Sequence, residues 1–437
     1  MKNLVKSANE QLSDLLMNAL GQAIGEGELP AEPIPAYTIQ IPADKSHGDF
    51  AANIAMVSAK AFRMAPRKIA EAIAKHIVLD GSCFERVEIA GAGFLNFFLS
   101  HRWFEDTVLA VSEEGENYGR SDYGKGKKYM VEFVSANPTG PMHIGNARGG
   151  VIGDSLASVL EHAGFDVTKE FYINDAGNQI NKFALSLDVR YQQIFKGEEA
   201  VPLPEDAYHG ADITEHARKF AELHGDSYLD KPEEERRKAL VDYALPLNIA
   251  GLKRDLSRYG IEYDVWFRES SLHESGAVMD AINKLTERGY TYEKDGAVWY
   301  KNAEILHKNL LAQGKSEEEI AKLELKDDVL IRANGTPTYF AADIAYHYNK
   351  FAVRGFDRVI NIWGADHHGH VARLKGAMDA IGLDGNKLDV VLMQLVRLMR
   401  NGETVRVSKR TGKSLTLTDL LDEVPVDAAR FFFNLRE

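Results

Sequence analysis

Cysteine is almost absent from this chain of 437 residues, and its scarcity narrows the class of protein. Cys83 is the only cysteine. A single thiol excludes an intrachain disulfide and any zinc site built from several cysteines. We therefore expect a cytoplasmic protein that contains no zinc.

Long hydrophobic runs are also missing. Although 45% of the residues are hydrophobic, no uninterrupted stretch is long enough to span a membrane. The chain shows no apolar run behind a basic start, so the sequence predicts neither a signal peptide nor a membrane partner. The length is typical of two or three domains.

Acidic residues outnumber basic ones: the chain has 65 Asp and Glu and 52 Lys and Arg, which gives a net charge of −13. This balance argues against a protein that coats nucleic acid without specificity, but not against a partner bound by a local basic patch. Such a patch spans residues 397–413, with six basic residues and the single acid Glu403. A smaller basic set lies between Lys60 and Lys75. It could equally be a second binding patch or an ordinary helix face exposed to solvent.

The residue pattern divides the chain into three parts. Residues 1–115 are typical of an α+β domain, with a helical segment expected at 50–77, and a linker rich in glycine and charge is expected at 115–126. Residues 116–395 alternate strand, helix and strand, with strands expected at 128–134, 167–173, 358–363 and 389–395. This pattern predicts an α/β domain with a parallel sheet and helical insertions at about 190–325. Residues 396–437 hold a basic loop and the start of a further helical domain.

The segment from Ser135 to Gly150 carries the clearest chemistry. An apolar strand at 129–134 precedes it, and a helix from Gly145 to Ala163 follows. The elbow between them is rich in glycine and proline and contains His143. Free backbone N–H groups at a helix N-terminus, beside the positive end of the helix dipole, suit a polyphosphate. The sequence therefore predicts a nucleotide site at this elbow.

Two signatures indicate the family. His143-Ile-Gly-Asn146 differs by one residue from the HIGH signature of class I aminoacyl-tRNA synthetases, and Arg406-Val-Ser-Lys409 resembles their KMSK loop. Asn401-Gly402 ahead of that loop predicts a tight hairpin turn. Four further segments resemble arginyl-tRNA synthetase, in that enzyme's order: 130–138, 172–178, 336–343 and 364–370. The resemblance implies a Rossmann-like catalytic domain preceded by an additional α+β domain.

The resemblance implies an arginine–tRNA ligase, which activates arginine with ATP and transfers it to tRNA(Arg). Catalytic roles are implied for His143, Asn146 and Lys409. The implied ATP site consists of Pro138, Gly140, His143, Gly145, Asn146, Gly364, Asp366, His367, Ser408 and Lys409. The implied arginine site consists of Glu132, Ser135, Asn137, Tyr339 and Asp343. The N-terminal domain would contact the tRNA elbow, and ATP would arrive with Mg²⁺. We expect a monomer with no metal ligands and no organic cofactor.

The positions of two acids support arginine specificity independently. Glu132 lies inside an apolar strand, and Asp343 follows an apolar segment, which are costly places for a carboxylate that has no cation to meet. A carboxylate can accept paired hydrogen bonds from a planar guanidinium. As alternatives, Glu132 could pair with an internal arginine, and Tyr339 could belong to the core.

Two rival functions remain open at this point. Asp366-His-His-Gly-His370 has the residue types of a metal centre, although a metal-dependent phosphoesterase would need further aspartates at other strand ends. A non-catalytic tRNA-binding relative would lack an intact nucleotide site, and His143 and Lys409 count against it.

The final predicted helix begins near Val426 and contains the consecutive residues Phe431 to Phe433. Three adjacent phenylalanines cover more than half of a helix circumference, so this helix is suited to burial nearly all round. In the family that the sequence resembles, a helical anticodon-binding domain continues from here. The sequence predicts a truncated or incomplete chain with an exposed apolar patch at this helix.

Overall fold

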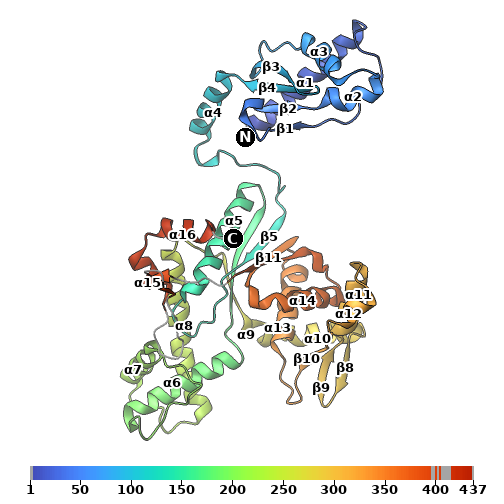
Figure 1. Ribbon diagram of the computed structural model, residues 1–437. Coiled ribbons are helices and arrows are strands. Elements are labelled where there is room, and N and C mark those ends of the chain that lie inside the picture. The colour runs from blue at the N-terminus through green and yellow to red at the C-terminus, as the bar shows by residue number, and fades with distance from the viewer. Residues whose placement is uncertain (1–2, 395–398, 401–402, 405–414, 436–437) are drawn as a thin grey trace. The chain divides into compact units, whose positions relative to one another are not determined.

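The computed structural model describes residues 3–394, 399–400, 403–404 and 415–435, and Figure 1 draws their helices and strands as a ribbon. The chain forms two compact units, Met1–Ser121 and Asp122–Glu437. The boundary between them falls within the predicted linker at 115–126. No helix in the described part of the chain is long and apolar enough to cross a membrane.

The first unit is an antiparallel sheet with helices packed against it. Its strands lie in the order β1-β2-β4-β3, and apolar residues of the α1 and α3 helices, including Leu12, Leu16 and Ile69, form its core. The strands are β1 (Ile39–Gln40), β2 (Phe50–Ala52), β3 (Phe84–Ala90) and β4 (Phe94–Leu99). The helices are α1 (Leu4–Gly25), η1 (Lys45–His47), α2 (Ile54–Phe62), α3 (Pro66–His76), α4 (His101–Glu114) and η2 (Gly115–Asn117).

One prediction for this unit is wrong. The segment 50–77 was expected to be helical throughout, but Phe50–Ala52 is a strand in which Phe50 pairs with Phe97 of β4. Helix α2 begins only after Asn53. A three-residue strand is too short to show an alternating pattern, so pairing with β4 decides its conformation.

The second unit is built on a five-stranded parallel sheet in the order β12-β11-β5-β6-β7. The strands are β5 (Lys128–Glu132), β6 (Asp166–Ile173), β7 (Val265–Arg268), β11 (Arg358–Gly364) and β12 (Leu388–Met393). Chain order reverses between β5 and β11, which is the position where open α/β sheets bind ligands. The predicted α/β class is confirmed, with four of these strands near their expected positions.

The prediction of helical insertions at about 190–325 is incomplete. Within that range β7 pairs with β6 as the fifth strand of the main sheet, and β8 (Thr291–Lys294) and β9 (Ala297–Tyr300) pair with β10 (Asp328–Ile331) in a small antiparallel sheet. These strands have four residues each. A run of four residues is too short to show a clear alternation of apolar and polar residues. Among charged neighbours such a run is hard to recognise as a strand from the sequence.

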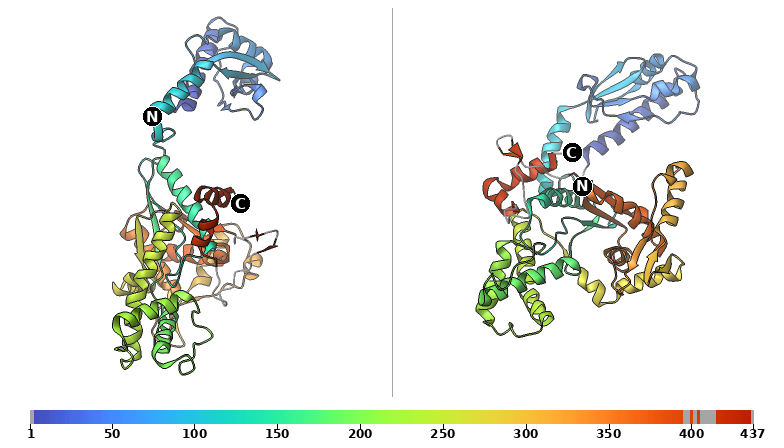
Figure 2. Two further views of the ribbon diagram at one scale, coloured as in Figure 1. Left: turned by 90° about the vertical axis from the view of Figure 1, so that its left-hand side faces the viewer. Right: turned by 60° about the horizontal axis from the view of Figure 1, so that its bottom comes forward.

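Helices cover both faces of the parallel sheet. In Figures 1 and 2 the green-to-yellow helices α6 to α8 lie on one side of β5 and β11, and the orange helices α13 and α14 lie on the other. The bounds are η3 (Ile144–Asn146), α5 (Ala147–His162), α6 (Asn178–Lys196), α7 (Ala211–His224), α8 (Glu233–Arg258), α9 (Glu269–Glu274), α10 (Ala277–Glu287), α11 (Asn302–Ala312), α12 (Glu317–Ala321), α13 (Tyr339–Tyr348), η4 (Asn349–Val353), η5 (Ala365–His367), α14 (His368–Ile381), η6 (Gly385–Lys387), α15 (Leu417–Glu423) and α16 (Val426–Leu435). Alternate residues of β5 serve the two faces, since Val131 joins one core and Met130 the other.

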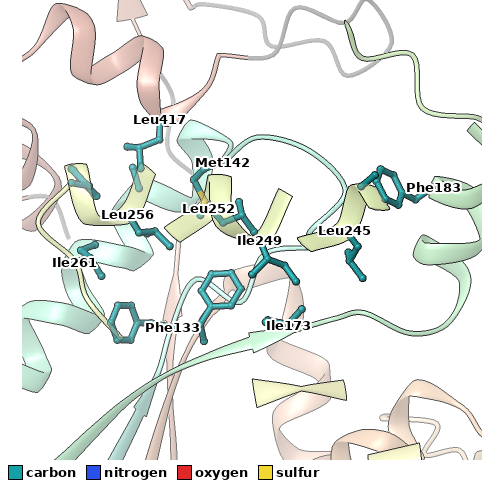
Figure 3. Packing of buried hydrophobic residues seen from close by; sticks show 14 of the residues in the cluster. Phe133, Met142, Ile173, Phe183, Leu245, Ile249, Leu252, Leu256, Ile261 and Leu417 are labelled. Atoms are coloured by element: carbon teal, nitrogen blue, oxygen red, sulfur yellow. The ribbon is translucent and has the colours of Figure 1, made fainter. Parts of the chain in front are cut away.

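The first of these cores fixes the ends of both signature segments. Figure 3 shows Met142, which precedes His143, and Leu417, which follows the KMSK-type loop, near Leu252 and Leu256 of α8. Met142 is 1% exposed and Leu417 is fully buried. Burial of large apolar side chains stabilises their positions by about 2 kcal/mol each. The two segments are thus anchored on one helix although they lie far apart in the sequence.

The final helix, α16, behaves as its sequence predicts. Arg430 of α16 donates to Asp154 of α5 at 2.6 Å, which attaches the helix to the α/β unit. Phe431 and Phe432 are about 60% exposed, while Phe433 packs partly against the core. The predicted exposed apolar patch is therefore confirmed for Phe431 and Phe432.

Candidate active site

A cavity of about 370 Å³ lies where the chain order of the parallel sheet reverses. It is bordered by the carboxyl ends of β5, β11 and β12, by the first turn of α5 and by one face of α13. The residues around it are Glu132, Val134, Ser135, Gly145, Asn146, Arg148, Gly149, Tyr172, Asp343, Tyr346, His347, Ile362, Trp363, Gly364, Asp366, His367, His370, Met393 and Gln394. Eight of the residues predicted for the ATP and arginine sites border this cavity, namely Glu132, Ser135, Gly145, Asn146, Asp343, Gly364, Asp366 and His367.

The backbone turns sharply where β5 enters the elbow. Val134 has φ +69° and Ser135 has φ +45°, so two consecutive residues other than glycine adopt left-handed conformations. For a β-branched valine this conformation is costly and persists only where the surroundings enforce it. The turn brings the Ser135 hydroxyl to Glu132, to which it donates at 3.0 Å, while it accepts from the Tyr172 N–H at 3.1 Å.

The signature segment forms the start of α5. His143 Nδ1 accepts a hydrogen bond from the Gly145 N–H at 2.9 Å and so caps the short helix η3. Gly145 and Asn146 border the cavity, whereas His143 does not. Pro138 and Gly140 lie farther back in the elbow, where the Pro138 carbonyl accepts from Asn248 of α8 at 3.1 Å.

The end of the KMSK-type loop is attached to this segment by backbone pairing. The Ile144 N–H donates to Leu415 at 3.1 Å, and the Leu417 N–H donates to Met142 at 2.8 Å. His143 and Thr416 form the bridge between them. Arg406, Ser408 and Lys409 lie outside the described residues. The predicted hairpin ahead of them is confirmed by antiparallel pairing of β13 (Met399–Arg400) with β14 (Glu403–Thr404), although residues 401–402 are themselves outside the description.

The opposite wall follows β11. Gly364, Asp366 and His367, which were predicted for the ATP site, border the cavity at the end of this strand and just after it, where open α/β sheets bind ligands. His370 lies one helical turn beyond His367 and joins its Nε2 to the Asp343 carboxylate at 2.8 Å. The sequence argument quoted His370 but did not place it in the site, although spacing of three residues puts both histidines on one helix face.

The two acids predicted for arginine recognition reach the cavity from different elements. Glu132 is 6% exposed at the end of β5, and Asp343 is on α13. The alternative that Glu132 pairs with an internal arginine is wrong, because its cationic partner is the buried Lys350. Two of the residues predicted with them lie elsewhere: Asn137 is exposed in the elbow, and Tyr339 borders a neighbouring cavity of about 650 Å³.

Tyr339 is not a core residue. It is 43% exposed, and its hydroxyl accepts from the Asn178 N–H at 2.9 Å. The same neighbouring cavity is bordered by Glu269, which is 3% exposed. Asp175 accepts from the Ser270 N–H at 2.8 Å and so caps helix α9.

Burial makes the Glu269 carboxyl a weaker acid than an exposed glutamate. Loss of water around the carboxyl, with Asp343 and Asp175 nearby, raises its pKa from 4.5 to about 7, against the opposing hydrogen bond from Tyr172. Between pH 4.5 and 7 the folded state therefore binds more protons than the unfolded state. The free energy of unfolding should fall as the pH rises through this window.

We predict that Glu269→Gln removes this decrease, because glutamine does not ionise. Relative to the variant, the unaltered protein should lose at most about 3 kcal/mol of unfolding free energy between pH 5 and pH 8. Urea unfolding of both proteins at the two pH values measures the difference. An identical change in both would show that Glu269 does not titrate in this window.

The histidine-rich segment does not assemble a metal centre in the described residues. His370 is bonded to Asp343, and the Asp366 and His367 side chains approach each other only to 3.7 Å. Where the structure describes the chain, the only group of three side chains placed to share an ion is Glu26, Glu28 and His76 in the first unit. Glu28 there also pairs with Lys75. This arrangement disfavours the phosphoesterase alternative.

Comparison with known proteins agrees with this geometry. A family model for tRNA synthetases class I (R), catalytic domain, matches residues 108–433, and one for the arginyl tRNA synthetase N terminal domain matches residues 10–99. With the parallel sheet and its cavity, the first match defines the chain as a class I aminoacyl-tRNA synthetase. The chain belongs to the arginyl-tRNA synthetase family, and its function is that of an arginine–tRNA ligase, with arginine, ATP and tRNA as substrates.

Individual relatives support the same assignment. The chain is 56% identical over 436 residues to the arginine–tRNA ligase of Caldanaerobacter subterraneus and 54% identical to that of Acetivibrio thermocellus, and it spans 74% of the length of each. A solved structure described as arginyl-tRNA synthetase from Campylobacter jejuni is 33% identical with a TM-score of 0.67, covering 78% of this chain and 69% of that one. Thermus thermophilus arginyl-tRNA synthetase, 19% identical with a TM-score of 0.57, covers 95% of this chain and 72% of its own and shares the fold.

Proposed function

We propose that the cavity of the second unit binds L-arginine and ATP side by side and forms arginyl-adenylate there. The supporting observation is that Glu132 and Asp343 border the same cavity as Gly145, Gly364, Asp366 and His367. The acids suit a guanidinium, and the glycines leave room for a nucleotide against the backbone. The adenylate would then react with the 3′ end of tRNA(Arg).

The chemistry requires alignment more than a covalent intermediate. The arginine carboxylate attacks the α-phosphorus of ATP, a C–O–P bond forms, and pyrophosphate leaves with the electron pair of the broken P–O bond. Negative charge on the phosphorus oxygens grows as the bond forms, so fixed donors that meet it lower the barrier. We assign this role to the N–H groups at the start of α5, to His143 and Asn146, and to Lys409 on the pyrophosphate.

Other features of the proposal come from the family resemblance. Mg²⁺ would accompany ATP as part of the substrate, and the enzyme would act as a monomer in the cytoplasm. Ser135 would serve arginine recognition by orienting Glu132, while Asn137 and Tyr339 would act from the adjacent elbow and cavity. The first unit would contact the elbow of the tRNA, as the corresponding domain does in the family.

The test is arginine-dependent exchange between ATP and labelled pyrophosphate, with and without tRNA(Arg), using lysine as the control amino acid. We expect exchange with arginine in the presence of tRNA, since enzymes of this type need bound tRNA for activation, and none with lysine. Equal exchange with lysine, or none with arginine when tRNA and the enzyme are both intact, would contradict the proposal.

A further inference from the structure

Three buried polar side chains lie in a row across the middle of the parallel sheet. Asn361 of β11, Glu132 of β5 and Glu170 of β6 occupy matching register positions, because Glu132 pairs with both neighbours. Their exposed fractions are 0%, 6% and 0%. Two carboxylates buried side by side are costly unless cations meet them.

Helix α13 and its extension η4 supply the partners. Tyr346, His347 and Lys350 follow Asp343 at spacings of three, four and seven residues, which places all four on one helix face. The Tyr346 hydroxyl donates to Glu170, which also pairs with Arg354. Lys350 contacts Glu132 and donates to the Asn361 side-chain oxygen at 3.2 Å.

Lys350 has no exposure to solvent and does not border the cavity, whereas Glu132 does. Its ammonium nitrogen lies 4.0 Å from the centre of the Tyr346 ring, so an aromatic face completes its surroundings. With Lys350 on one Glu132 oxygen and the Ser135 hydroxyl on the other, the carboxylate is held in one orientation. A lysine placed this way acts on the cavity only through Glu132 and its neighbours.

A second line of contacts leads from Lys350 to Asp343. The Asn361 amide nitrogen lies 3.0 Å from His347 Nε2, and His347 Nδ1 lies 2.8 Å from the Asp343 carbonyl. Burial and the nearby Lys350 hold the pKa of His347 well below 6.5, so its ring is neutral. A neutral ring satisfies both contacts by donating from Nδ1 and accepting at Nε2. The same lysine thereby supports the helix turn that carries the second acid.

We propose that Lys350 is a positioning residue for arginine recognition, holding the Glu132 carboxylate, and through Asn361 and His347 the Asp343 turn, in the geometry that receives the guanidinium. The inference rests on the proposed role of Glu132 and Asp343 in the arginine site. It assigns no contact between Lys350 and the substrate. It predicts that loss of the lysine weakens arginine binding more than it affects ATP binding.

The experiment measures exchange kinetics, with tRNA present, for Lys350→Met, Glu132→Gln and the double variant. We expect each single change to raise the KM for arginine by about tenfold or more, the range for a hydrogen bond to a charged group, with the KM for ATP changed less than threefold. Because both changes act through one carboxylate, the double variant should raise the KM for arginine by less than the product of the single effects.

Arg354→Met is the matched control, since it removes a cation directly after η4 whose partner, Glu170, does not border the cavity. It should lower the Tm and leave the KM for arginine unchanged. If Lys350→Met does not fold, Lys350→Gln, whose amide can still donate to Glu132, is measured in its place and should raise the KM for arginine in the same direction.

The outcomes separate this inference from the site on which it rests. If Glu132→Gln raises the KM for arginine and the Lys350 variants leave it within twofold, the positioning role is overturned and the arginine site stands. If Glu132→Gln also has no effect, the assignment of Glu132 itself is overturned. If Arg354→Met raises the KM for arginine as much as Lys350→Met does, the effect of the lysine variant comes from general destabilisation. That result would overturn the inference.

Discussion

Asp343→Asn is expected to raise the KM for arginine about 100-fold in the exchange reaction, with little change in the KM for ATP. A carboxylate pairs with a guanidinium through two charge-assisted hydrogen bonds, and asparagine loses the charge and presents a donor to another donor. Truncating one partner of a desolvated charge pair costs about 3 kcal/mol, which is this factor in affinity. Asp343 lies on the cavity wall, where His370 orients it at 2.8 Å.

Asp328→Asn is the matched control for this prediction. Asp328 is also a partly buried acid in the second unit, but it pairs with Arg373 and does not border the cavity. Its replacement should lower stability and leave the KM for arginine within about twofold. An Asp343→Asn enzyme with an unaltered KM for arginine would remove Asp343 from the binding site.

Lys409→Met is expected to lower the rate of exchange by a factor of about 100 to 1,000 while leaving the KM for arginine nearly unchanged. This is the usual effect of removing one fixed donor that meets charge developing in a transition state. Although Lys409 lies outside the described residues, Leu415 is held beside Ile144 by a backbone hydrogen bond of 3.1 Å. Leu415 follows Lys409 by six positions in the sequence, so the chain contacts the signature segment close to the lysine in sequence.

The control for the lysine is Lys387→Met, a replacement of the same type on an exposed position ahead of β12. Its exchange rate should match that of the unaltered enzyme. A Lys409→Met enzyme with a normal rate and a raised KM for arginine would instead place the lysine in substrate binding.

The fold was predictable wherever the sequence shows long apolar or periodic segments. Strands β5, β6, β11 and β12 follow from apolar runs, and the pairing of β13 with β14 follows from the Asn-Gly pair between them. Strand β7 escaped prediction because Val265–Arg268 has only four residues, and its place in the sheet depends on pairing with β6, which lies almost a hundred residues earlier. Such pairing is a property of the folded chain and leaves little local trace.

The site was predictable to the extent that its residues follow strands or carry family signatures. Glu132 and Gly364 meet in one cavity because parallel strands end at one edge, and Gly145 and Asp343 reach the same cavity from η3 and α13. Lys350 had no such signal, since it lies beyond the helix in a π-helical segment, η4, and its partner is more than two hundred residues away. A buried charge can be recognised only once the burial is known.

The most direct test of the account is calorimetric titration of the enzyme, with tRNA(Arg) bound, by arginine and by citrulline. Citrulline has nearly the same shape, but its urea group carries no charge. If Glu132 and Asp343 recognise a guanidinium, arginine should bind about 100-fold more tightly than citrulline, and Asp343→Asn should remove most of that preference. Equal affinity for the two ligands would contradict the claim that these acids form the arginine site.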